Sequence, residues 1–138
     1  MKITRFEELE IWQLARELYK TVFQITSREP FNHDYKFRDQ IRASSGSISD
    51  NIAEGFERGG NKEFIQFLSI SKGSCGETRN QAYRAFDSQY IDKKELDELL
   101  ERTDLISRKI AALIKHMKSA SQKGVKYDTP NAEPHNSQ

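Results

Sequence analysis

The chain has 138 residues, which is typical of one domain and is enough to bury a single hydrophobic core without disulfides or metals. Apolar residues make up 36% of the sequence and charged residues 31%, and 22 Lys and Arg nearly balance 21 Asp and Glu. The formal net charge of +1 excludes a strongly basic protein, so any binding of nucleic acid must depend on local clusters of positive charge.

Cysteine usage and hydropathy indicate the compartment. Cys75 is the single cysteine, which excludes an internal disulfide and fits a reducing environment. The N-terminal segment MKITRFEELEIWQLARELYK carries acids where a signal peptide would be apolar, and charges interrupt every apolar run before it reaches membrane-spanning length. We therefore expect a soluble cytoplasmic protein that does not enter a membrane.

The first predicted helix begins near Arg5 and ends before Pro30. Thr4 and Glu7 have the spacing of a capping box, and Pro30 would remove an amide donor and clash with the preceding turn. The apolar residues of this helix form a face that is wider than one neighbouring helix requires. They fall into two stripes: Ile11, Leu14, Leu18 and Ile25, and next to it Trp12, Ala15, Tyr19 and Val22.

The second predicted helix runs from about Asp34 to Arg58 and is followed by the flexible pair Gly59 and Gly60. Its stretch ASSGSIS, residues 43–49, resembles a linker, but it fits a helix with an apolar or small face. Gly46 costs about 1 kcal/mol in a helix relative to Ala, which is tolerated where another backbone approaches closely. We expect the third helix to be that partner.

The third predicted helix spans residues 61–89, with Asn61 as its N-cap. Its large apolar residues lie at both ends of a middle made of small residues. Two small-residue segments in consecutive helices predict that these helices are in contact. The small residues are Ser71, Gly73, Ser74, Cys75 and Gly76.

The fourth predicted helix begins at Asp92, which forms a capping-box pattern with Glu95. Its apolar positions then alternate in steps of three and four, which is the seam spacing of helical bundles. The seam residues are Leu96, Leu99, Thr103, Ile106, Ile110, Leu113 and Met117.

The predicted fold is an all-α, antiparallel, up-down-up-down four-helix bundle, because helices joined by short turns become antiparallel neighbours. The bundle domain comprises residues 1–118. Residues 119–138 have too few apolar side chains to offset the entropy of ordering, so we expect a disordered tail.

A polar stripe follows the small face of the second helix. A solvated stripe usually carries Lys and Glu at several positions, whereas this one starts with Ser44, Ser47 and Asn51. Short polar side chains suit a close interface in which hydrogen bonds set the register. We therefore predict a half-buried network of Asn51, Glu54 and Arg58 with groups of the third helix such as Glu77 and Arg79.

Ligand and catalytic motifs do not explain these segments. GFERGGNK, residues 55–62, has glycines at P-loop spacing, but Asn61 stands in place of the lysine and no strand precedes it. Ser74 and Cys75 have no histidine nearby that could act as a base, so Cys75 is interpreted as a small packing residue. No Glu-x-x-His metal motif occurs. We predict no catalytic residues, no metal and no cofactor.

Several segments resemble one family. FEELEIW, DQIR, SISDNIAEGFER, KEFIQFL, GSCGET and YI, in this order between residues 6 and 91, are similar to the signature blocks of four-helix-bundle proteins encoded in intervening sequences of bacterial 23S ribosomal RNA genes. The resemblance implies a four-helix bundle assembled as a ring-like homo-oligomer, commonly a pentamer, with no known enzymatic activity. Related accessory proteins of diversity-generating retroelements bind nucleic acid and a reverse transcriptase through basic surfaces.

The wide apolar face of the first helix independently favours self-association. We expect Trp12 or Tyr19 at the interface between subunits. The alternative is that these aromatic residues cover the core of their own bundle.

Positive charge gathers late in the sequence. Between Leu105 and Tyr127 there are six basic residues and no acid, whereas residues 92–104 are mostly acidic. This distribution complements a helix dipole, but in a ring it would also repeat weak basic patches that act together on a polyanion. The predicted phosphate contacts are Arg58, Lys62, Arg108, Lys109, Lys115 and Lys118.

Two functional classes remain open. The first is an oligomer that binds RNA or DNA through phosphates, largely without regard to sequence. The second is a scaffold that recruits a partner protein and does not bind nucleic acid.

Overall fold

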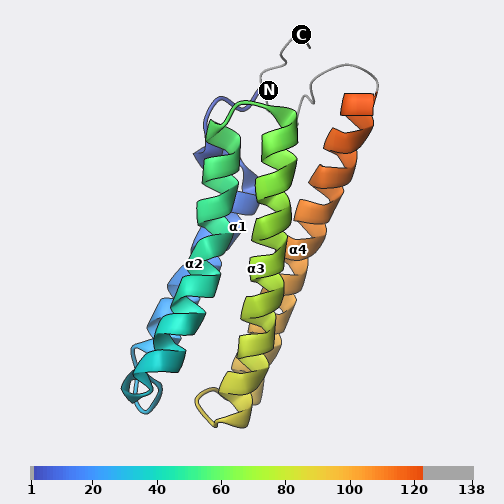
Figure 1. The fold of residues 1–138 in the computed structure, drawn as a ribbon. Coiled ribbons are helices and arrows are strands. Elements are labelled where there is room, and N and C mark those ends of the chain that lie inside the picture. The colour runs from blue at the N-terminus through green and yellow to red at the C-terminus, as the bar shows by residue number, and fades with distance from the viewer. Residues whose placement is uncertain (1, 123–138) are drawn as a thin grey trace.

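The computed structural model describes residues 2–122, which form four α-helices and two short 3-10 turns. Consecutive helices are joined at alternating ends, so each runs antiparallel to the next (Figure 1). The predicted all-α class with four helices is confirmed. In chain order the elements are η1 (Phe6–Glu8), α1 (Glu10–Thr26), η2 (Phe31–His33), α2 (Tyr35–Glu57), α3 (Asn61–Asp87) and α4 (Lys93–Gln122).

The last helix is longer than the sequence indicated. Residues 119–122, which we predicted as the start of the tail, form the final turn of α4. The rest of the predicted tail, residues 123–138, lies outside the described residues.

Two of the predicted helix starts are present. At α4 the Asp92 amide donates to Glu95 Oε1 at 3.0 Å, and the Glu95 amide donates to Asp92 Oδ1 at 2.8 Å, which is the reciprocal geometry of a capping box. At α2 the side chain of Asp34 accepts a hydrogen bond from the Phe37 amide at 3.3 Å. These caps satisfy amides that have no partner within the helix.

The other two helix starts differ from prediction. Glu8, not Glu7, accepts the amides of Thr4 and Arg5, at 2.9 and 3.2 Å. This contact closes η1, after which the backbone is extended at Leu9 and α1 starts at Glu10. Gly60, not Asn61, occupies the N-cap position of α3.

The core lies between all four helices. The α4 seam is confirmed, since all of its predicted members except the partly buried Leu113 are buried. On α1 the second apolar stripe also enters this core, because Ala15 and Val22 are buried while Trp12 and Tyr19 are only half-buried. The largest completely covered side chains include Phe31, Leu18, Ile41, Ile48, Ile52, Leu68 and Ile110.

The predicted contact between the small-residue segments of α2 and α3 is present as a buried polar seam. Ser71 Oγ donates to the Ile48 carbonyl at 2.8 Å, and the hydroxyls of Ser47 and Ser74 are 3.0 Å apart. One turn further along, Thr78 donates to Ser44 at 3.0 Å and Ser44 donates to Gln81 Oε1. Small hydroxyl residues let the two helices approach, and their hydrogen bonds satisfy the groups that the approach buries.

The role predicted for Gly46 is wrong. A Cβ at this position would lie 3.6 Å from the Tyr19 ring of α1, which is an ordinary contact and not a close approach of α3. The close approach is at Gly55 instead, where a Cβ would lie 2.6 Å from the Cβ of Phe67 on α3. At Gly55, one turn before the connecting Gly59 and Gly60, α2 and α3 therefore leave no room for a side chain.

Candidate functional site

Three lysines surround an open groove between α3 and α4. The groove has a volume of about 520 Å³ and is lined by Lys72, Ala111, Ile114, Lys115, Lys118 and Ser119. Residues 111, 114, 115 and 118 fall on one side of α4 because they are spaced by three and four, and all three lysines are exposed. We call this surface the lysine groove. It combines an apolar floor with a rim of positive charge.

Lys115 and Lys118 are the predicted phosphate contacts that lie in the lysine groove. Lys72 is the residue that sequence reasoning missed. A single lysine on α3 does not predict a binding site from the sequence alone. That Lys72 lies on the side of α3 that faces α4 becomes clear only when the two helices are packed. The hydrogen bond of Arg79 to the Leu100 carbonyl, at 2.8 Å, marks the same side of α3.

Arg58 and Lys62 lie at the α2–α3 connection, at the same end of the bundle as the last turns of α4 (Figure 1). Lys62 is exposed in the first turn of α3. Arg58 pairs with Glu54 at 2.8 Å and lies over the Phe67 ring at 5.1 Å. These two cations share one end of the molecule with the lysine groove but do not line it.

Arg108 and Lys109 lie outside the lysine groove and are paired with acids. Arg108 contacts Asp104 one turn earlier on α4 at 2.8 Å, and Lys109 contacts Glu10 at the start of α1 at 3.0 Å. Exposed ion pairs of this kind contribute at most about 1 kcal/mol to the stability of the fold and can exchange partners. In this structure they neutralise the charges of Arg108 and Lys109. The six predicted phosphate contacts therefore do not form one patch.

The predicted network of Asn51, Glu54, Arg58 and Glu77 is not the arrangement found. Asn51 donates within its own helix to the carbonyl and hydroxyl of Ser47, at 2.8 and 2.9 Å. Glu54 and Arg58 pair with each other at the surface, and Glu77 is exposed. Long charged side chains stay in water because burying them is costly, so the α2–α3 seam is built from short hydroxyl residues and Gln81.

Both aromatic residues predicted at an oligomer interface lie along α1. Trp12 packs edge-to-face on Phe6 with ring centroids 5.3 Å apart, and the Arg16 guanidinium lies 5.6 Å from its ring centre. Tyr19 lies against Gly46 of α2. Each ring thus covers part of its own bundle and keeps part of its surface exposed.

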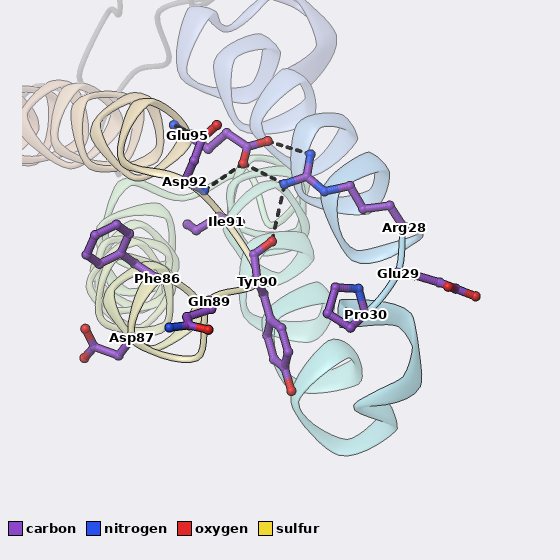
Figure 2. Close-up of a pocket in the computed structure, with 10 residues that line it drawn as sticks. All are labelled: Arg28, Glu29, Pro30, Phe86, Asp87, Gln89, Tyr90, Ile91, Asp92 and Glu95. Carbon is purple, nitrogen blue, oxygen red and sulfur yellow. Dashed lines mark hydrogen bonds and ion pairs between the residues drawn. The ribbon is translucent and has the colours of Figure 1, made fainter.

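A second cavity, of about 660 Å³, lies at the opposite end of the bundle (Figure 2). Figure 2 shows Arg28, after α1, reaching Glu95 in the first turn of α4, where they form an ion pair at 2.6 Å. The hydrogen bond from Arg28 lowers the pKa of Glu95, and Arg28 also donates to the Tyr90 carbonyl at 3.4 Å. These contacts connect α1 to the α3–α4 connection.

The Tyr90 side chain extends this connection to α2. Its hydroxyl donates to Asp34 Oδ2 at 2.7 Å, which raises the pKa of Tyr90, and its ring stacks on Phe31 at 4.6 Å. Arg28, Tyr90 and Glu95, which line the cavity, are therefore used in holding the helices together. Sequence reasoning missed this site because Arg28, Asp34, Tyr90 and Glu95 come from distant segments.

Two observations concern metal binding and the reactivity of the single cysteine. Within residues 2–122, no cluster of three or more His, Cys, Asp or Glu side chains is arranged to hold a metal ion. Burial raises the pKa of the Cys75 thiol to about 12, so it is not poised as a nucleophile. None of the described helices has the length and apolarity needed to cross a bilayer.

Comparisons with known proteins agree with this architecture. Residues 7–112 match the family described as 23S rRNA-intervening sequence protein. A crystal structure of a protein of unknown function from the S23 ribosomal protein family of Bacteroides thetaiotaomicron superposes with a TM-score of 0.70 at 20% sequence identity. The superposition covers 76% of this chain and 95% of that one, and at this identity it supports the fold alone. No protein with a curated description matches the chain. Because the family match covers well over half of the sequence, the chain belongs to the 23S rRNA-intervening sequence protein family.

Proposed function

We propose that this protein is a non-enzymatic, self-associating helical bundle that binds RNA or DNA through phosphate contacts. The observation that carries the proposal is the lysine groove, where Lys72, Lys115 and Lys118 from two helices face one open surface. The near-neutral net charge does not oppose it, because phosphate binding depends on the local potential and not on the total.

The chemistry of the lysine groove favours a polyanion over a small acid. Lysine ammonium groups are flexible point charges that suit phosphates without fixing one geometry. The apolar floor of Ala111 and Ile114 offers no hydrogen bonds that would read base edges. Binding should therefore be largely independent of sequence and strongly dependent on salt.

Self-association would strengthen such binding. We propose a ring-like homo-oligomer, a pentamer by family resemblance, with the half-buried Trp12 at the contact between subunits. Each subunit then presents its own lysine groove, and several weak contacts on one nucleic acid add up to a higher avidity. The mass of the purified protein, measured by analytical ultracentrifugation for the wild type and for Trp12→Ala, tests this part.

A pair of double variants tests the phosphate contacts. Lys115→Gln/Lys118→Gln removes two charges from the lysine groove, and Lys93→Gln/Lys94→Gln removes two exposed charges from the opposite end of α4. We expect the first to lower the slope of log affinity against log salt for a labelled RNA hairpin by about two, and the second to leave it unchanged. Equal slopes for both variants would contradict the assignment. No binding by the wild type would favour the protein-scaffold alternative.

A further inference from the structure

An open groove between α1 and α2 combines positive charge with the aromatic ring of Tyr19. It has a volume of about 640 Å³. On the α2 side it is lined by the small residues Ala43, Gly46 and Ser49, whose short side chains leave the groove open. The remaining residues that line it are Arg16, Tyr19, Lys20, Arg42 and Asp50. Three cations therefore face one acid. We call this surface the α1–α2 groove.

Phe23 is not part of the lining of the α1–α2 groove, but its ring contacts two residues that are, Tyr19 and Arg42. It is 46% exposed, and its ring centre lies 6.2 Å from that of Tyr19 one turn earlier. The two rings follow each other along α1 because their spacing of four places them on one side of the helix. Together they form a short aromatic surface beside the groove.

The guanidinium of Arg42 lies against this aromatic surface and is held in place by hydrogen bonds. It lies 4.2 Å from the centre of the Phe23 ring and donates to the hydroxyls of Thr26 and Ser27, at 2.8 and 3.1 Å. These partners are neutral, so they hold the guanidinium without cancelling its charge. Among the described residues no ion pair involves Arg42 or Arg16, whereas Lys20 pairs with Glu17 at 3.2 Å.

We propose that the α1–α2 groove binds a segment of single-stranded nucleic acid. Bases stack on Phe23 and Tyr19, while Arg16, Lys20 and Arg42 contact the backbone phosphates. Single-strand binding surfaces combine a positively charged groove with exposed aromatic rings in this way, because every base has a face that can stack. The inference rests on the proposed function, to which it adds a strand preference and a second site.

A single strand fits the groove better than a duplex does. In a duplex the base faces are stacked on each other, so the rings of Phe23 and Tyr19 would find no partner there. None of the described residues that line the lysine groove is aromatic, so in our proposal this groove contacts phosphates of either form. The two surfaces thus predict different responses to strand separation.

The test compares Phe23→Leu with a matched control, Tyr35→Leu. Tyr35 is 61% exposed and lies beneath Arg38 at 5.0 Å, so it repeats the cation–ring pair of Phe23 and Arg42 on a part of α2 outside the groove. Fluorescence anisotropy with a labelled oligouridine of about 12 nucleotides and with a duplex of equal length measures the two dissociation constants. Phe23→Tyr keeps an aromatic face and serves as the rescue.

We expect Phe23→Leu to weaken binding of the oligouridine by about tenfold, with no change for the duplex or for the salt dependence. Phe23→Tyr and Tyr35→Leu should bind like the wild type. Thermal melting of each variant establishes that it is folded, and if Phe23→Leu does not fold, Phe23→Met provides the same comparison.

The proposal is overturned if Phe23→Leu binds the oligouridine as tightly as the wild type does. If Lys115→Gln/Lys118→Gln then still weakens binding, the proposed function stands and only this groove is wrong. A change in oligomer mass without a change in affinity would show instead that the groove faces a second copy of the chain. A wild type that binds neither probe would contradict both proposals.

Discussion

A Cβ atom placed on Gly55 would lie 2.6 Å from the Cβ of Phe67, a separation that real Cβ atoms essentially never show. This contact fixes the distance between α2 and α3 near their connection. The same helix pair is held along its length by hydrogen bonds between small hydroxyl residues. Residue size, as well as hydrophobicity, therefore sets the spacing between α2 and α3.

Gly55→Ala should destabilise the bundle, because the added methyl group meets side-chain atoms attached directly to the backbone. We expect a loss of about 1–3 kcal/mol in the free energy of unfolding, measured in urea. Gly73→Ala is the control, since a Cβ there meets nothing within 4 Å. It should stabilise the helix by about 0.5–1 kcal/mol. Equal effects of the two substitutions would contradict the close approach at Gly55.

Gln81→Ala should also destabilise the protein. Gln81 is only 4% exposed and accepts the hydrogen bond of the buried Ser44 hydroxyl. Removing this acceptor leaves a buried polar group with poorer partners and creates a cavity, which together cost about 1–3 kcal/mol. The adjacent exposed Asn80→Ala should change stability by less than about 0.5 kcal/mol in the same urea titration. A small effect at Gln81 would show that the polar seam contributes little.

Acid should weaken the link between Arg28 and Glu95. The hydrogen bond from Arg28 lowers the pKa of Glu95 below 4.5, so the stabilisation is fully present above that value and is lost as the pH falls through the lower, folded-state pKa. Wild type should therefore be more stable than Glu95→Gln at neutral pH, and the difference should shrink below about pH 4.5. Melting temperatures measured from pH 7 downward test this. A difference that is constant with pH would contradict the ion pair.

Cys75 should be unreactive in the folded protein. Desolvation raises the pKa of its buried thiol to about 12, so very little thiolate exists near pH 8. A thiol-specific reagent such as Ellman's reagent should modify it slowly under native conditions and rapidly in denaturant. Fast modification of the native protein would mean that the hydrophobic core around Cys75 opens readily.

Sequence patterns predicted the elements of the bundle better than their relative orientation. The capping box of Asp92 and Glu95 and the seam of α4 were predicted correctly, because both depend on spacing within one helix. The capping acid of the first turn was wrong by one residue, since Glu8 and Glu7 are equally plausible caps until the η1 turn is known. The predicted start near Arg5 was also wrong, because this turn is a separate 3-10 element and α1 starts only at Glu10. Local spacing does not distinguish such alternatives.

Contacts between helices were harder to predict. Gly46 and Gly55 lie in the same small-residue face, yet only Gly55 meets another helix closely, and this depends on how each helix is rotated about its axis. Rotation also explains why Lys72 joins Lys115 and Lys118 and why Arg42 reaches Phe23. Neither pattern has a signature along the chain, because each depends on residues from different helices.

The most direct test of the proposed function is the affinity of the full-length wild-type protein for a labelled RNA hairpin across salt concentrations from about 50 to about 200 mM. Our account predicts measurable binding at low salt and a linear fall of log affinity with log salt, because lysines displace counterions from the phosphates. Absence of binding at the lowest salt concentration, or an affinity that does not change with salt, would contradict it.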